Sequence, residues 1–269
     1  MKSLFKGIVA GAFAAVLATG AQAGDTYKVG IDQTNYEPFA LKDASGTWSG
    51  WEIDLMNAVC ESQKMTCELA PTAWDGIIPA LQEKKIDFIF ASMTITEERK
   101  QQVDFSDFYY DSTVVIIGPK ADTTKIDFDN PDSVKGKVFG AQGATIHSKF
   151  LDKRFGSTAE VKKYDGLDNA LADLAAGRVD FVQEGLSTLS AFMNSPEGKD
   201  FEVKAKVPAD PIMGGGVGAA VRKGDTELLA KLNAGIKDVV TSGKYDEITK
   251  KYPDLDQQYQ AGQMFKPAY

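Results

Sequence analysis

Histidine and cysteine are almost absent from this sequence, which contains one histidine, His147, and two cysteines, Cys60 and Cys67. Two thiolates without a neighbouring histidine make a poor zinc site, so we expect no metal centre. The cysteines lie at the end of a predicted helix and in the strand that follows it. In an exported chain such a pair is expected to form a disulfide, with two buried free thiols as the alternative.

Long hydrophobic runs are also absent. The apolar stretch at residues 7–20 is short and rich in alanine and glycine, so it is a poor membrane span. Lys2 and Lys6 precede it, and residues 21–23, Ala-Gln-Ala, match the small-residue pattern of a cleavage site. We expect residues 1–23 to be a cleaved signal peptide, with an uncleaved anchor as the alternative. The product is then a soluble protein of a Gram-negative periplasm.

Positive charge is in deficit. The net charge of −8 becomes −10 when Lys2 and Lys6 leave with the signal peptide. A strongly acidic chain is a poor partner for nucleic acid or for an anionic membrane. The glycine run at residues 214–216 is no phosphate loop, because it lacks the Lys-Ser/Thr pair and precedes a strand. We expect no nucleic-acid partner and no cofactor.

The order of predicted elements divides the remaining chain into two α/β lobes. Strands and helices alternate over residues 27–90 and again over 138–183, which predicts in each lobe a parallel sheet with helices on both faces. The extended run at residues 110–117 is expected to cross between lobes, and the chain returns near residues 208–216, making a two-strand hinge. The expected division is a first lobe of residues 24–111 and 212–269 and a second of residues 112–211.

A short internal echo supports two related lobes. Residues 81–88 and 174–181 share the pattern Leu-x-x-x-x-Ile/Val-Asp-Phe, a helix end that leads into a strand. The alternative is that helix–strand junctions of α/β proteins often look alike. The preceding helix of the first lobe is expected over residues 74–83, and two final helices, residues 226–242 and 244–250, are expected to pack on that lobe.

The stretch at residues 90–99 is the most informative of the chain. A predicted strand runs into Ser92 and Thr94, and a helix is expected to begin after Thr96 as N-cap, with Arg99 in its first turn. A guanidinium beside hydroxyls and unpaired helix amides is suited to a small carboxylate, which arginine can bind with two parallel hydrogen bonds. No nucleophile accompanies it, so the pattern indicates binding without transformation.

Other polar side chains follow predicted strands or open predicted helices, where ligands bind in open α/β sheets. These are Asp32, Tyr36, Trp74, Gln142, Thr145 and Glu184. With Arg99 they supply one guanidinium, two carboxylates, hydroxyls and aromatic faces. This set complements a zwitterion with a polar or cationic tail.

Several of these residues, and the lone histidine, also have a purely structural interpretation. His147, just inside a helix, is expected to be a surface or rim histidine. The alternatives for the others are an ion pair of Arg99 with Asp104 or Asp107, core packing of Trp74, turn capping by Asp32, and a solvated charge at Glu184.

Six motifs carry a family resemblance over about residues 27–253. They are Tyr-Glu-Pro-Phe at 36–39, Gly-Trp-Glu-Ile-Asp-Leu at 50–55, Trp-Asp-Gly-Ile-Ile-Pro at 74–79, Thr-Ile-Thr-Glu-Glu-Arg at 94–99, Phe-Ser-Asp at 105–107 and Gly-Lys-Tyr at 243–245. The chain resembles the family 3 periplasmic solute-binding proteins of polar amino-acid ABC importers, and within them the lysine/arginine/ornithine- and histidine-binding group. The spacing of the two cysteines also resembles the disulfide of that group.

The resemblance implies a two-lobed periplasmic binding protein fold of type II, with a mixed sheet flanked by helices in each lobe, and a role for most of the site residues. Arg99 would hold the ligand α-carboxylate, with Ser92, Thr94 and the backbone amide of Thr145. Tyr36 and Trp74 would sandwich the ligand side chain. Asp32 would face its distal end, and Glu184 would hold the α-ammonium. The partners implied are an amino acid and the permease subunits of an ABC importer in the inner membrane, and the protein would act as a monomer.

Two departures from the family pattern leave alternatives open. Glu184 stands where the family usually has Asp, and Ala91 stands where the cationic group tends to have Ser. A modified amino acid or an opine, whose nitrogen is substituted, is therefore an alternative ligand. Dehydratase-like enzymes on the same fold and a sensory role are the alternative functions, and the lone histidine argues against an enzyme.

Overall fold

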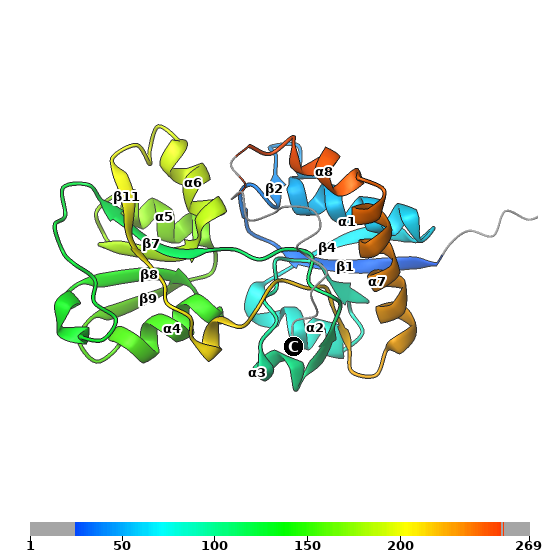
Figure 1. Ribbon diagram of the computed structural model, residues 1–269, viewed down its shortest axis with the longest axis horizontal. Helices are drawn as coiled ribbons and strands as arrows, with labels where there is room; N and C mark the ends of the chain where they lie inside the picture. Colours follow the sequence, from blue (N-terminus) through cyan, green and yellow to red (C-terminus); the bar gives the residue numbers. More distant parts are fainter. Residues whose placement is uncertain (1–24, 254, 256–269) are drawn as a thin grey trace, which may run out of the picture.

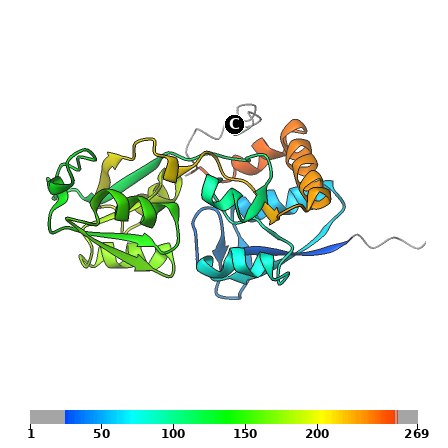
Figure 2. The same ribbon diagram turned by 90° about the horizontal axis from the view of Figure 1, so that it is seen from below.

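The computed structural model describes residues 25–253 and 255, so the predicted signal peptide lies outside the described residues. Two lobes lie side by side and are joined by extended segments (Figures 1 and 2). The five-stranded sheet of one lobe has the order β4-β1-β5-β12-β6, and that of the other has the order β11-β7-β10-β8-β9. Each sheet contains parallel and antiparallel pairs, so both are mixed, as the family resemblance implies, and not wholly parallel, as the order of elements predicts.

The first lobe is built on residues from both ends of the chain. Its main strands are β1 (Thr26–Asp32), β4 (Thr66–Thr72), β5 (Phe88–Ile89), β6 (Val103–Phe105) and β12 (Ala220–Arg222), and a two-stranded ribbon adds β2 (Leu41–Lys42) and β3 (Trp48–Ser49). Its helices are α1 (Trp51–Ser62), α2 (Ile77–Gln82), α3 (Glu97–Lys100), α7 (Thr226–Thr241) and α8 (Lys244–Thr249).

Apolar side chains cover both faces of the first sheet. On one face Leu55 and Val59 of α1 pack with Leu232 and Ile236 of α7 and with residues of α8. On the other face α2 packs against β5 and β12. The predicted docking of the two final helices on this lobe is confirmed.

The second lobe uses residues between the two crossings. Its strands are β7 (Val114–Pro119), β8 (Val138–Gln142), β9 (Glu160–Tyr164), β10 (Phe181–Gly185) and β11 (Phe201–Lys206), and its helices are α4 (Ile146–Phe155), α5 (Leu167–Ala175) and α6 (Leu186–Asn194). Short 3₁₀ turns occupy Pro131–Val134 and Pro211–Met213. Alternation along β7 places Ile116 in the core beneath α4 and Val115 and Ile117 in the core beneath α5, as expected for a strand buried on both faces.

The crossing segments lie beside each other between the lobes. The N–H of Val217 donates to the carbonyl of Tyr110 at 2.7 Å, and the N–H of Tyr109 donates to the carbonyl of Val217 at 2.8 Å. These bonds join the outgoing and returning segments of the chain (Figure 1). The predicted limit at residues 111/112 falls within the outgoing segment, and the limit at 211/212 falls within the 3₁₀ turn Pro211–Met213; both stay predictions.

Several predicted element limits are wrong in detail. Residues 74–83 do not form one helix: Trp74–Gly76 form a single 3₁₀ turn and α2 begins at Ile77. The strand predicted at 86–90 shrinks to Phe88–Ile89, and the crossing strand begins only at Val114. β5 is short because only two residues of β1, Val29 and Gly30, pair with it.

The predicted disulfide is present. Cys60 near the end of α1 is bonded to Cys67 in β4. The bond therefore links a helix to an edge strand of the first sheet, at the end of α1 opposite to the site described below.

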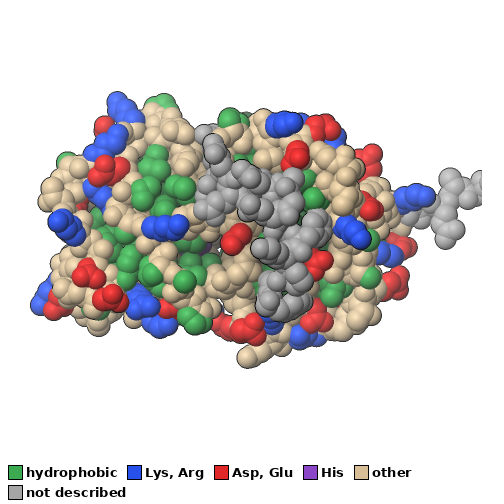
Figure 3. Space-filling model, in the orientation of Figure 1, with side chains coloured by type: hydrophobic (Ala, Val, Ile, Leu, Met, Phe, Trp, Pro, Cys, Tyr) green, Lys and Arg blue, Asp and Glu red, His purple; other side chains and the backbone are tan. Residues whose placement is uncertain are grey.

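Charges of both signs are spread over the face drawn in Figure 3, with apolar side chains between them on the second lobe. Within the described part of the chain, no helix has both the length and the hydrophobicity needed to cross a membrane.

Candidate ligand-binding site

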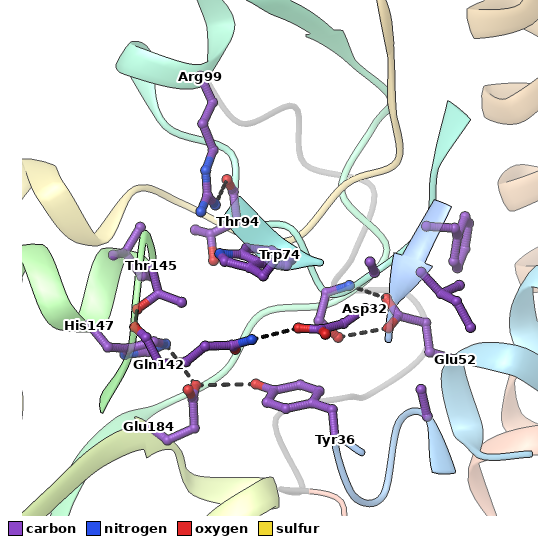
Figure 4. A pocket seen from close by; sticks show the side chains of 16 residues that line it. Asp32, Tyr36, Glu52, Trp74, Thr94, Arg99, Gln142, Thr145, His147 and Glu184 are labelled. Atoms are coloured by element: carbon purple, nitrogen blue, oxygen red, sulfur yellow. Dashed lines mark hydrogen bonds and ion pairs between the residues drawn. The ribbon is translucent and has the colours of Figure 1, made fainter. Parts of the chain in front are cut away.

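A cavity between the two lobes contains every residue that the sequence predicts for the site (Figure 4). Its lining residues are Ile31, Asp32, Tyr36, Ala40, Glu52, Trp74, Phe90, Ala91, Ser92, Thr94, Arg99, Gln142, Thr145, Ile146, His147 and Glu184. Glu52 and His147 carry polar groups that the sequence analysis did not assign to the site.

Strand ends explain why these residues meet. Asp32 is the last residue of β1, Gln142 the last of β8, and Glu184 lies next to the last residue of β10. The two sheets turn their carboxyl ends toward each other across the cavity, so residues far apart in sequence become neighbours.

Arg99 is held by its own short helix. Thr96 is the N-cap, as predicted, and its hydroxyl accepts from the N–H of Arg99 at 3.2 Å. The guanidinium donates to the carbonyl of Thr94 at 2.8 Å and lies 5.4 Å from the centre of the Trp74 ring, a cation–π distance. Burial lowers the pKa of Arg99 to about 10, which leaves the group charged at neutral pH. Asp104 pairs with Lys223, and among the described residues Arg99 forms no ion pair with Asp104 or Asp107, so that alternative is wrong.

Glu52, in the first turn of α1, shapes the loop that leads to Arg99. Its carboxyl group accepts from the N–H of Ser92 at 2.7 Å and from the Ser92 hydroxyl at 2.8 Å, and the Tyr109 hydroxyl donates to it as well. Ser92 has φ 49°, a left-handed conformation that is costly for a residue with a side chain. The bonds to Glu52 offset this cost. They also mean that the Ser92 hydroxyl faces Glu52, so its predicted role beside Arg99 stays a prediction.

Asp32 and Gln142 connect the lobes. The amide of Gln142 donates to Asp32 at 2.6 Å and to the carbonyl of Asp165 at 3.0 Å. The other oxygen of Asp32 accepts from the N–H and hydroxyl of Thr34, both at 2.9 Å. Burial raises the pKa of Asp32, and the hydrogen bonds from Thr34 and Gln142 offset part of that rise. Asp32 therefore caps a turn and lines the cavity at once.

Glu184 is buried and lies opposite Asp32 in the cavity. Its Oε1 accepts from the backbone N–H of Gly185 at 2.8 Å, from the hydroxyl of Tyr36 at 3.1 Å and from Nε2 of His147 at 2.7 Å. The alternative of a solvated charge is wrong, because Glu184 is only 3% exposed.

The expectation that His147 lies on the surface or rim is also wrong. It is 8% exposed, because it follows directly on Ile146 in the first turn of α4, and that turn faces the first lobe across the cavity. No pattern in the neighbouring sequence predicts this burial, because the partner of His147, Glu184, lies on another element.

The two lobes are in contact around the cavity. Tyr36 bonds to Glu184 and Asp32 to Gln142, while the indole N–H of Trp74 donates to the carbonyl of Ala144 at 3.3 Å. The rings of Trp74 and Tyr36 lie on opposite sides of the Gln142–Asp32 bond in Figure 4. An outer ion pair of Lys149 with Glu98, at 2.7 Å, joins α4 to α3.

The arrangement suits a small zwitterion, which carries one positive and one negative charge. One wall presents the guanidinium of Arg99, and carboxylates stand elsewhere around the cavity at Asp32 and Glu184, with aromatic faces between. Buried opposite charges act strongly on a ligand that matches them, because the surrounding dielectric constant is low. Among the described residues, no group of three or more His, Cys, Asp and Glu residues is arranged to hold a metal ion.

Known proteins are similar to this chain in sequence and in fold. The sequence model of one protein family, the bacterial extracellular solute-binding proteins, family 3, matches residues 27–254. The L-arginine-binding protein of Pseudomonas aeruginosa is 37% identical over 232 residues, which span 85% of this chain and 88% of that protein. The lysine/arginine/ornithine-binding periplasmic protein of Escherichia coli is 35% identical over 86% of this chain and 89% of its own length.

A solved structure gives the same result for the fold. An ancestral arginine-binding protein bound to arginine superposes with a TM-score of 0.78 at 34% identity, over 86% of this chain and 99% of that one. The predicted two-lobed binding-protein architecture is therefore confirmed.

Proposed function

The chain belongs to family 3 of the bacterial extracellular solute-binding proteins, and on that premise we propose that it captures a cationic L-amino acid and delivers it to an ABC importer. The relatives described above are named for arginine, lysine and ornithine, and they are binding proteins. Arginine, lysine, ornithine and histidine are the ligands that we consider.

The observation that carries the proposal is the placement of Arg99. Its guanidinium is buried, stacked on Trp74 and held by the Thr94 carbonyl, with further N–H groups available to a carboxylate. A buried cation of this kind gains most from an anionic partner, and bidentate pairing with the ligand α-carboxylate supplies one.

The other residues complete one binding mode. The α-ammonium would bind Glu184, and the side chain would lie between the rings of Tyr36 and Trp74, where an alkyl stem or a flat guanidinium can stack. The distal cation would approach Asp32, which already shares one oxygen with Gln142. The backbone amide of Thr145, the N-cap of α4, would add a donor from the second lobe.

A second candidate ligand is an amino acid with a substituted nitrogen, such as an opine. A neighbouring cavity shares Tyr36, Ser92, Thr94, Ile146, His147 and Glu184 with the first. It extends from Glu184 toward Ser112 and Gly216 at the crossing segments. An N-substituent on a nitrogen bound at Glu184 would have space there.

Export and partners follow the family. We propose that residues 1–23 are removed on export, that the protein works as a periplasmic monomer, and that permease subunits of the inner membrane receive its ligand. We assign no catalytic residue.

The test is the affinity of Arg99→Ala for L-arginine by calorimetry. Removing the carboxylate partner is expected to weaken binding by more than tenfold, about 1.4 kcal/mol. Lys100→Ala is the matched control, since it removes a cation from the same helix without removing a residue that lines the cavity. Equal affinities of the two variants would refute the role given to Arg99.

A further inference from the structure

His147 shares the carboxylate that the proposed function assigns to the ligand nitrogen. Nε2 of His147 lies 2.7 Å from Oε1 of Glu184, and both side chains are buried in the wall of the cavity (Figure 4). A ligand ammonium bound at Glu184 would therefore stand next to the imidazole. If the imidazole carried a proton, two cations would compete for one carboxylate.

The side chain behind the imidazole can form a hydrogen bond with it in either of its charge states. The side-chain amide of Gln183 is fully buried, and its Nε2 lies 3.5 Å from Nδ1 of His147. Its Oε1 is buried without a hydrogen-bond partner among the described residues. In this orientation the amide can donate to a neutral imidazole. Exchanging the amide oxygen and nitrogen by a flip offers Nδ1–H an acceptor and so suits the imidazolium.

We propose that His147 carries a proton in the free protein and gives it up when a cationic amino acid binds at Glu184, so that ligand binding is coupled to proton release. In the free protein the imidazolium pairs with Glu184 and with the amide oxygen of Gln183. The ligand ammonium then replaces this charge, and the neutral imidazole keeps its Nε2–H bond to Glu184. This inference rests on the proposed function for the identity of the ligand.

Other charged and titratable groups face the same space. Glu184 contacts the imidazole from β10, and the Tyr36 phenol approaches Glu184 from the loop after β1. The rest of the two cavities presents Asp32 from β1, Glu52 from α1, Arg99 from α3 and Asp111 from the crossing segment. Asp32 and Glu52 both have raised pKa values through burial, so they are the rival sources of a released proton.

The chain offers a direct probe, because His147 is its only histidine. In protein labelled with ¹⁵N-histidine, the two ring nitrogens report charge and tautomer without assignment ambiguity. At about pH 6, the free protein should give an imidazolium pattern, because the ring is paired with the Glu184 carboxylate. Saturating L-arginine should convert it to a neutral ring protonated at Nε2. An unchanged charge state on binding would overturn the proposal, and so would a neutral ring in the free protein.

Calorimetry with L-arginine at the same pH, in two buffers of different ionisation enthalpy, measures the number of protons released. We expect the wild type to release about one proton per ligand. His147→Gln, which keeps an N–H donor for Glu184, should release almost none. Release that persists in His147→Gln and disappears in Asp32→Asn would assign the proton to Asp32 and refute the proposal.

The two hypotheses fail in different ways. No heat with L-arginine, or with any other cationic amino acid, would contradict the proposed function. The spectrum of the free protein would still decide whether His147 carries a proton. Binding of L-arginine without a change at His147 would leave the proposed function intact and reject this inference.

Discussion

Glu52 accepts three hydrogen bonds, two from Ser92 in the loop between β5 and α3 and one from the Tyr109 hydroxyl. Its pKa is raised by burial, and the donors Tyr109 and Ser92 offset only part of that rise. A carboxyl group whose pKa is higher in the folded than in the unfolded state favours folding at low pH. Its ionised form then costs stability as the pH rises from the unfolded pKa through the folded one.

Glu52→Gln tests this argument. Gln can accept from the Ser92 N–H and donate to the Ser92 hydroxyl, and it does not ionise. Relative to the wild type, the free energy of unfolding of the variant should increase as the pH rises above about 4.5, with a slope of at most about 1.4 kcal/mol per unit. Urea unfolding at several pH values measures it.

Glu61→Gln is the matched control, because Glu61 is exposed on the same helix. A difference between Glu52→Gln and the wild type that does not change with pH would contradict the assigned ionisation.

Asp32→Asn tests the residue predicted to select for a cation. The variant keeps an acceptor for Thr34 but loses the charge, so arginine and lysine should lose more affinity than glutamine does. Calorimetry with the three amino acids gives the comparison. Asp132→Asn, on the exposed surface of the second lobe, controls for net charge. Equal losses for all three ligands would show that Asp32 does not recognise charge.

Residues at strand ends were predictable, whereas the contacts between them were not. Arg99, Asp32 and Glu184 follow from strand and helix signals that lie within a few residues. His147 and Glu52 join the site only through partners more than 30 positions away in sequence, at Glu184 and Ser92. A pattern along one segment carries no information on such pairs.

At the scale of elements, the echo between the lobes has a structural counterpart. The helices α2 and α5 end in the same way, with the residue after the C-cap in the left-handed region: Lys84 at φ 61° and Gly177 at φ 68°. In each case the next N–H bonds to a carbonyl five positions earlier, Lys85 to Ala80 and Arg178 to Asp173. This is the Schellman motif, in which glycine is favoured.

Lys84→Gly should therefore stabilise the protein. A left-handed conformation costs a lysine roughly 1–2 kcal/mol, and the extra freedom of glycine in the unfolded chain offsets part of the gain. We expect an increase of about 0.5–1 kcal/mol in the free energy of unfolding, measured by urea titration. Lys85→Gly, one residue further and also exposed, should lower stability. A loss of stability in Lys84→Gly would contradict the motif assignment.

Element identity was easier to predict than element length. The amphipathic pattern of α1 and α7 survives in the fold, because those helices bury one continuous apolar face. The helix predicted at residues 74–83 begins instead with a 3₁₀ turn, which places Trp74 at the cavity and frees its indole to reach the Ala144 carbonyl. Such a shift is decided by the second lobe, which no local pattern describes.

At the scale of the whole molecule, the candidate site lies where the two lobes meet. Arg99, Trp74 and Asp32 come from one lobe, and Thr145, His147 and Glu184 come from the other. A ligand that contacts both sets of residues favours a closed arrangement of the two lobes, to the extent that it binds that arrangement more tightly than an open one. The alternation of strands and helices in each lobe and the two crossings between the lobes could be anticipated from the sequence, but the side-chain contacts across the cavity could not.

Binding of a cationic L-amino acid is tested most directly by a thermal-shift panel on the purified protein with the common amino acids, ornithine, citrulline and several opines, followed by calorimetry on the ligands that respond. We expect a large shift with arginine, lysine, ornithine or histidine and no consumption of the ligand. A shift only with N-substituted amino acids would favour the opine alternative. The absence of any shift, or turnover of the bound compound, would contradict the proposed function.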